Sequence, residues 1–203
     1  MSLARTLWAT NADLAERILA HGFVRGLGDG SLPVDCFKSY VAQDAYFLEA
    51  FARAYAFCLA NSTTRQDLAD FADLIAGVRD ELALHKAYAE RWQVDLTGVV
   101  PLAATQAYVD FLLKIARRGD LGETIAAMTP CMRLYAFLGR ALSAGPVAPL
   151  YAEWVKTYAD PGFEVLAARL EALLDRHATN SAAVHANYAS AMDLEYGFFD
   201  ANF

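Results

Sequence analysis

Cysteine is scarce in this sequence, and long apolar runs are missing from it. Its three cysteines, Cys36, Cys58 and Cys131, are odd in number and widely spaced, which argues against both a disulfide framework and a CxxC zinc site. No stretch approaches the roughly 18 consecutive apolar residues of a membrane-spanning helix. The segment 1–22 carries charged residues at helical spacing, unlike the apolar core of a signal peptide. We therefore expect a cytoplasmic protein with no membrane partner.

Basic residues are outnumbered and are not clustered. The chain has 17 Lys and Arg against 24 Asp and Glu, which gives a formal net charge of −7. Proteins bind nucleic-acid phosphates mainly through Lys and Arg, so a chain without a basic stripe is not expected to bind nucleic acid directly. The sequence also lacks the acidic or Ser/Pro-rich tail that is typical of disorder.

The residues that are present indicate a helical bundle. Hydrophobic residues make up 56% of the 203, enough for one large core, and nothing in the composition suggests a second domain. Apolar residues recur at helical spacing, and few β-branched runs are long enough for a strand. Helix starts are marked by Pro33, by Thr64 with Asp67, and by Asp160 before Pro161. We predict one all-α domain over 1–203, a bundle of seven to eight helices at about 3–21, 33–60, 65–93, 101–118, 120–143, 147–158, 161–177 and 180–203.

Two carboxylates interrupt the apolar stripes of these helices. Asp44 falls in the stripe of the second helix, and Glu195 falls in that of the last. An unpaired buried carboxylate costs several kcal/mol, so each side chain needs a partner, a proton or a cavity beside it. Burial also raises the pKa of a carboxyl group, which can make it a general acid near neutrality. The alternative for each residue is a structural hydrogen-bond anchor.

A cysteine is the third marked position. Cys131 shares a helix face with Tyr135, one turn further on, and with Met128. Pro130 cannot donate a hydrogen bond to the carbonyl of Ala126, so we expect a kink beside the sulfur that opens the bundle wall. The alternative is an ordinary core cysteine, because cysteine is among the most often buried residues.

Aromatic residues are numerous near these positions. A planar heteroaromatic ligand would stack on such rings, and a carboxylate would bind its amino group and ring nitrogen. A plain aromatic core is the alternative. The residues concerned are Tyr40, Tyr46, Phe47, Tyr108, Tyr135, Tyr158, Tyr188 and Phe198.

Several segments, in order, resemble the signatures of one known family. Residues 21–33 (HGFVRGLGDGSLP) are similar to its opening motif, HPF-x-x-G-(I/L)-x-D-G-(S/T)-L-P. Further matches follow at 37–48 (FKSYVAQDAYFL), 107–108 (AY), 130–131 (PC, with Tyr135 four residues later), 151–158 (YAEWVKTY) and 195–199 (EYGFF). The chain therefore resembles the TenA-like (thiaminase II) family over positions 21–199, nearly its whole length.

The resemblance implies a fold and an activity. The fold is the heme-oxygenase-like helical bundle, usually a homotetramer, with no haem, metal or other cofactor. The activity is hydrolysis of a small-molecule substrate, 4-amino-5-aminomethyl-2-methylpyrimidine, to the hydroxymethylpyrimidine and ammonia in thiamin salvage, with slower cleavage of thiamin. Cys131 matches the nucleophile that adds to the pyrimidine ring. Glu195 matches the acid/base for the leaving amine and the incoming water, and Asp44 the carboxylate that binds the ring nitrogen and 4-amino group.

The resemblance also implies the walls of the substrate pocket. Tyr135 matches the hydroxyl near the thiol, and Phe47 stands where some family members have a hydroxyl group. The remaining matches are Tyr108, Tyr158 and Phe198.

The sequence departs from the family pattern at a few positions. Met132 and Arg133 stand where many relatives have aromatic residues, and Gly22 replaces the usual proline after His21. Arg133 therefore faces either the pocket wall or the surface, and substrate preference depends on which. The presence of Cys131 argues against the subgroup that lacks this cysteine.

Two other functions remain open at this point. Glu81 and His85 lie one helical turn apart, which suits a metal-ligand pair of an oxidase on the same fold, or an interhelix hydrogen bond. The second is a non-catalytic pyrimidine-binding or regulatory protein.

Overall fold

The computed structural model describes residues 2–203, and within this part of the chain all regular structure is helical. It has ten α-helices and one short 3₁₀ helix rather than the seven to eight helices predicted. The all-α prediction is confirmed. The elements are α1 (Leu3–Thr10), α2 (Ala12–Leu19), α3 (Gly22–Asp29), α4 (Val34–Asn61), α5 (Arg65–Trp92), α6 (Ala103–Ala116), α7 (Leu121–Ser143), η1 (Pro149–Tyr151), α8 (Ala152–Ala159), α9 (Pro161–His177) and α10 (Ala182–Ala201).

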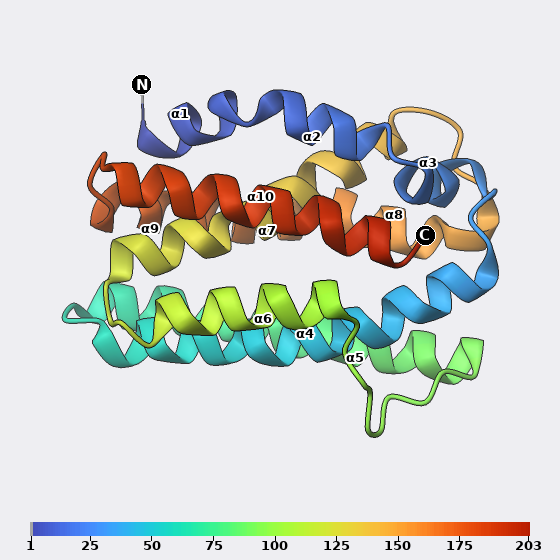
Figure 1. Ribbon diagram of the computed structural model, residues 1–203, viewed down its shortest axis with the longest axis horizontal. Helices are drawn as coiled ribbons and strands as arrows, with labels where there is room; N and C mark the ends of the chain where they lie inside the picture. Colours follow the sequence, from blue (N-terminus) through green and yellow to red (C-terminus); the bar gives the residue numbers. More distant parts are fainter. Residues whose placement is uncertain (1) are drawn as a thin grey trace.

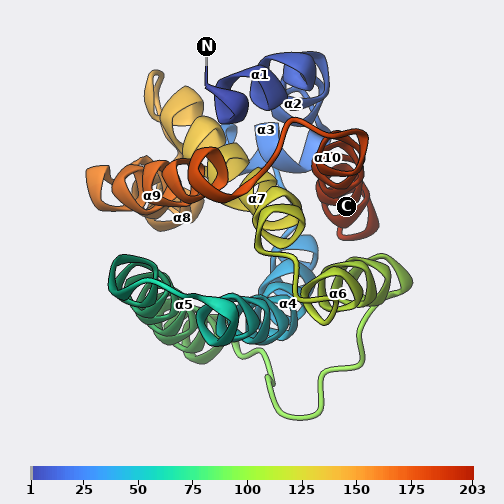
Figure 2. The ribbon, with the colours of Figure 1, turned by 90° about the vertical axis from the view of Figure 1, so that its left-hand side faces the viewer.

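The long helices form two layers. Helices α5, α4 and α6 lie side by side in one layer, and the second layer has α7 at its centre, with α8 and α9 on one side and α10 on the other (Figure 1; Figure 2). Helices α1 to α3 cover the outer face of the second layer. Because α4 contacts α7 between the layers, side chains of these two helices meet at the centre of the bundle.

The extra helices come from two breaks near the N-terminus. Asn11 ends α1, and its side chain donates a hydrogen bond to the Leu7 carbonyl at 2.8 Å, in competition with the backbone ladder. The Gly-rich segment after residue 21 forms α3, whose first turn is capped by His21. Gly30 ends this helix with φ 81°, a conformation that glycine adopts without strain.

Two of the predicted helix starts have the expected hydrogen bonds. The Thr64 hydroxyl accepts from the Asp67 backbone N–H at 3.0 Å, and the Asp160 carboxylate accepts from the Gly162 N–H at 2.7 Å, with Pro161 in the first turn. Helix α7 continues through Pro130. In the described part of the chain, no helix has the length and hydrophobicity of a membrane span.

One glycine fixes the approach of α8 to α7. A Cβ atom at Gly139 would lie 2.3 Å from the Tyr158 carbonyl carbon and 2.6 Å from the Ala159 nitrogen. Real Cβ atoms do not approach backbone so closely, so only glycine lets the two helix backbones pack at this distance. The site residues of α8 therefore sit against α7.

Candidate active site

The three marked side chains come from three helices and all lie inside the bundle. Asp44 on α4 is 4% exposed and Glu195 on α10 is 1% exposed, so the prediction that both carboxylates face inward is confirmed. Cys131 on α7 is half-buried. Burial raises the pKa of its thiol well above the usual range, and the charges of Glu195, Glu81 and Asp44 raise it further. The structure thus brings the three predicted residues within electrostatic range of one another.

Glu195 accepts a hydrogen bond from a tyrosine and also interacts with the Cys131 thiol. The Tyr108 hydroxyl on α6 donates to Glu195 Oε1 at 2.7 Å. Burial raises the pKa of Glu195 to about 8, against the lowering effect of this hydrogen bond, and the charge of Asp44 adds to the increase. The carboxyl group is therefore mostly protonated at neutral pH, as a general acid requires.

Asp44 is bound on one of its two oxygens. His85 Nε2 lies 2.7 Å from Asp44 Oδ2, off the axis of a linear hydrogen bond, and the Tyr40 hydroxyl donates to the same oxygen at 3.1 Å. Among residues 2–203, no hydrogen bond reaches Oδ1. This oxygen is therefore the one that a ligand could use.

The orientation of His85 determines where its proton lies. Nδ1 is 3.0 Å from the backbone carbonyl of Glu81, which can only accept, so Nδ1 carries a hydrogen. Nε2 faces a carboxylate oxygen, and two acceptors at that separation need a proton between them. Burial alone would lower the pKa of His85, but the Asp44 and Glu81 carboxylates outweigh it and raise it to about 9. The pair is therefore an imidazolium beside a carboxylate.

Glu81 is a fifth ionisable group of this cluster, and the sequence did not predict its place there. The Tyr158 hydroxyl on α8 donates to Glu81 Oε1 at 2.6 Å. Burial, followed by the charge of Asp44, raises the pKa of Glu81 to about 7. The spacing of Glu81 and His85 was the available signal, but it suggested metal ligands. The structure instead favours the alternative of interhelix contacts, since Glu81 binds α8 and His85 binds α4.

The predicted pocket walls meet around this cluster. The rings of Phe47 and Tyr108 have centroids 4.5 Å apart, those of Phe47 and Phe198 6.2 Å, and those of Tyr135 and Tyr158 4.8 Å. The Tyr40 hydroxyl connects the two groups, because it lies 3.4 Å from that of Tyr135. Trp154, the Trp of the YAEWVKTY segment, donates to the same hydroxyl at 3.1 Å.

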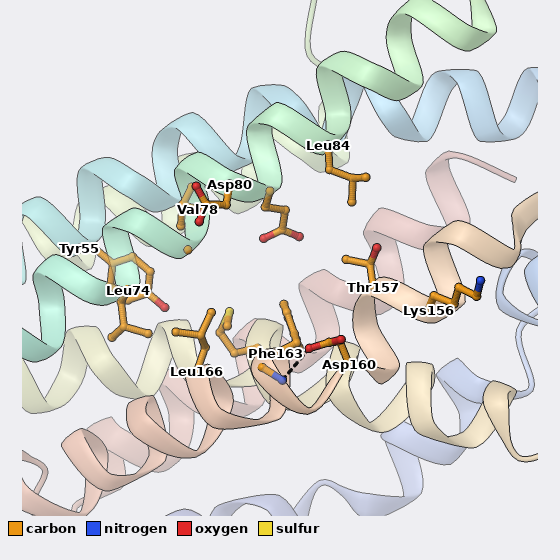
Figure 3. Close-up of a pocket in the computed structure, with 14 residues that line it drawn as sticks. Tyr55, Leu74, Val78, Asp80, Leu84, Lys156, Thr157, Asp160, Phe163 and Leu166 are labelled. Atoms are coloured by element: carbon orange, nitrogen blue, oxygen red, sulfur yellow. Dashed lines mark hydrogen bonds between the residues drawn. The ribbon is translucent and has the colours of Figure 1, made fainter.

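A cavity of about 530 Å³ adjoins the cluster at Glu81. Side chains of α5, such as Leu74 and Leu84, face Thr157 and Phe163 of α8 and α9 across it (Figure 3). Glu81, Tyr55 and Met132, the residue after Cys131, also line it, whereas Asp44, Glu195 and Cys131 are not part of this lining. The three predicted residues therefore lie behind its wall, on the side of α4 and α7.

The side chains of Arg133 and Met132 have different contacts and therefore different roles. The Arg133 guanidinium binds Glu171 at 2.6 and 2.8 Å and Glu164 at 2.8 Å, both on α9. Its side chain thus holds α9 against α7, while Met132 lines the cavity. Of Met132 and Arg133, only Met132 is part of the cavity wall.

No group of three or more His, Cys, Asp or Glu side chains in residues 2–203 is arranged to hold a metal ion. The other three histidines have partners outside the cluster: His21 contacts Asp200 at 3.4 Å, His177 contacts Asp67 at 3.0 Å, and His185 contacts Asn180 at 2.7 Å.

Solved structures share this architecture. A TenA family protein from Silicibacter sp., described as a transcription regulator, superimposes with a TM-score of 0.92 at 25% identity, covering 99% of this chain and 96% of that one. A TenA homologue from Pyrococcus furiosus has a TM-score of 0.90 at 20% identity, with 98% of both chains covered, which shows the shared fold.

Sequence comparison points to the same group. A protein of Halalkalibacterium halodurans named aminopyrimidine aminohydrolase is 34% identical, over 98% of this chain and 95% of its own length. A Bacillus subtilis protein of the same name is 30% identical, over 93% of this chain and 84% of its own. The profile of the TENA/THI-4/PQQC family matches residues 8–202, so the chain belongs to this family.

Proposed function

We propose that the protein is an aminopyrimidine aminohydrolase of the thiaminase II type, acting in thiamin salvage. It replaces the amine of 4-amino-5-aminomethyl-2-methylpyrimidine with a hydroxyl group from water and releases ammonia. Relatives that match almost the whole chain carry this name. The observation that carries the proposal is the convergence of the Cys131 thiol with the Asp44 and Glu195 carboxyl groups, from three helices, in one buried cluster.

The first step is addition of the sulfur to the ring. The thiol is protonated in the resting site, so the proton must leave Cys131 as the bond forms. Glu195, whose carboxyl group interacts with the thiol, is the group we assign to that transfer. With a pKa of about 8, it accepts the proton in its ionised form, which is the minor form at neutral pH. Asp44 Oδ1 binds the edge of the pyrimidine that carries the amino group and the ring nitrogen, and His85 holds Asp44 through its other oxygen.

Addition breaks the aromaticity of the pyrimidine. The ring electrons can then expel the exocyclic amine, water adds to the methylene carbon, and the sulfur leaves to restore the ring. The rings of Phe47, Tyr108 and Phe198 offer faces for a flat heterocycle. The neighbouring cavity of 530 Å³ falls in the usual range of ligand pockets, about 300–1,000 Å³.

Ammonia release tests the proposal. The purified protein is incubated with the aminomethylpyrimidine, with thiamin, and with oxidised or formylated thiamin breakdown products, and ammonia and the hydroxymethylpyrimidine are measured. We expect the aminomethylpyrimidine to be preferred, because the site binds the pyrimidine half. A large preference for an unrelated amine, or no ammonia from any pyrimidine, would contradict the proposal.

The assembly, location and domain extent are also proposals. The family resemblance supports a homotetramer, a cytoplasmic location and one domain over 1–203. Light scattering on the purified protein tests the first: a mass near four times the chain mass of 22.2 kDa is expected.

A further inference from the structure

Glu81 stands on the side of the cluster that faces the cavity. It lines the cavity together with Tyr55 and Met132, whereas Glu195 is enclosed by protein. The same cavity reaches the surface, because its lining includes the exposed side chains of Lys156 and Asp160. Water that enters by this route, and an amine that leaves by it, pass Glu81.

Glu81 and Glu195 occupy matching positions around the thiol. Each carboxyl group accepts one short hydrogen bond from a tyrosine hydroxyl, Tyr158 for Glu81 at 2.6 Å and Tyr108 for Glu195 at 2.7 Å. Their helices, α5 and α10, lie on opposite sides of the bundle in Figure 2, with α4 and α7 between them. The site therefore has two carboxyl groups, each of which can donate or accept a proton during the reaction.

We propose that Glu81 is a second acid/base residue of the reaction, which protonates the departing amine and then takes a proton from the incoming water. This inference rests on the proposed function and divides the work that the family resemblance gives to Glu195 alone. As the carbon–nitrogen bond breaks, the nitrogen keeps the electron pair and receives the Glu81 proton. As the new carbon–oxygen bond forms, water returns a proton to the Glu81 carboxylate, so the residue ends as it began.

The surroundings of Glu81 suit both halves of this cycle. Its pKa of about 7, raised by burial and then by Asp44, makes the acid and the base form available near neutral pH. Titration of Glu81 is coupled to the groups that face it, which are Asp44 from α4, His85 from α5, Cys131 from α7 and Tyr158 from α8. Tyr55 and Tyr88 are also within electrostatic range of Glu81.

A comparison of two substrates distinguishes this acid/base role of Glu81 from a structural role. The aminomethylpyrimidine releases ammonia, which needs a proton to depart, whereas thiamin releases a neutral thiazole whose nitrogen needs none. Glu81 must therefore start protonated for the amine and ionised for thiamin. In the wild-type protein, the ratio of the amine rate to the thiamin rate should fall as the pH rises through about 7.

The test is Glu81→Gln, assayed with both substrates from pH 5.5 to 9. Gln is similar in size and its carbonyl can accept the Tyr158 hydrogen bond, so the fold should be kept; binding of the hydroxymethylpyrimidine product checks this. We expect kcat for the amine to fall by about 100-fold and the amine-to-thiamin ratio by at least about 10-fold. The pH dependence of that ratio should disappear. Glu90→Gln, on the exposed face of the same helix, is the matched control and should leave the rates with both substrates unchanged.

The outcomes distinguish this inference from the proposed function. If the wild-type protein releases no ammonia, the proposed function fails. The other outcome is an active wild type in which Glu81→Gln lowers the rates with both substrates equally, or lowers neither rate. Glu81 then has no role at the leaving group, and the inference is overturned.

Discussion

Two buried carboxylates of this protein have opposite environments. Asp67, near the start of α5, is fully buried and binds the Thr64 hydroxyl at 2.6 Å, His177 at 3.0 Å and the Arg176 guanidinium. Burial alone would raise the pKa of Asp67, but these hydrogen bonds outweigh it and lower the value to about 2. Glu195 is as deeply buried, yet its close partner is the neutral Tyr108, and its pKa is raised to about 8.

The difference lies in the partners rather than in burial. The Arg176 guanidinium and the other hydrogen bonds keep Asp67 charged. Asp67 ties the C-terminal end of α9 to the start of α5, which is a structural role. A phenol leaves Glu195 with its proton, which it can give up during a reaction. Burial of a carboxylate therefore does not by itself distinguish the two roles; the charge of what it contacts does.

The largest effect is expected at the thiol. Cys131→Ala removes the nucleophile, and we expect ammonia release to fall by at least about 10³-fold. The fold and the binding of the hydroxymethylpyrimidine should remain, since the side chain is small and half-buried. Kinetic assays and ligand titration check this. Unchanged activity would show that the cluster around Glu195 is no more catalytic than the one around Asp67.

Glu195→Gln should have opposite effects on activity and on stability at high pH. Gln cannot accept the thiol proton, so we expect a loss of about 10²–10³-fold with both the aminomethylpyrimidine and thiamin, unlike the selective loss predicted for Glu81→Gln. At pH 8–9 the variant should unfold at a higher temperature than the wild type, because it avoids a buried ionised carboxylate. Thermal unfolding at several pH values measures this second effect.

Asp67→Asn should show the reverse pattern. The substitution removes the carboxylate from Arg176 and His177, and we expect a loss of about 2 kcal/mol in the free energy of unfolding. The folded variant should keep most of its activity, since Asp67 lies at the start of α5, well before Glu81, and Arg176 and His177 lie at the end of α9. Urea unfolding and ammonia release test the two statements. A large drop in kcat without a drop in stability would break the comparison.

The smallest effect is expected in the pH dependence of stability. The region around Asp67 and the region around Glu195 should show opposite dependences. The folded-state pKa of Asp67 is below its usual value of 3.8, so its contribution is present above about pH 4 and lost as the pH falls towards about 2. The values for Glu195, Glu81 and His85 are above their usual ones, which are 4.5 for Glu and 6.5 for His. Their contributions are therefore fully present below those usual values and are lost as the pH rises from them to about 8, 7 and 9. We expect slopes of about 1 kcal/mol per pH unit in each window, measured by chemical unfolding.

Helical periodicity predicted much of this arrangement. The apolar stripes placed Asp44 and Glu195 inside the bundle, and the structure has both there. The stripe pattern describes one helix at a time, however, and does not show which helices are neighbours. For that reason Glu81 and His85 were noticed only as a pair on one helix, and their partners on α8 and α4 became visible only in three dimensions. The helix over Gly22–Asp29 was missed because its glycines disfavour a helix in isolation, whereas packing stabilises it here.

The close packing at Gly139 has a consequence for the acidity of Glu81. Tyr158, which binds Glu81, belongs to the piece of backbone that a methyl group at Gly139 would displace. A position with no functional group, on a different helix, therefore governs the proton affinity of an acid in the site. Efforts to alter the rate of this protein by substitution should include such backbone contacts, since the side chains that touch the pyrimidine are only part of what sets its chemistry.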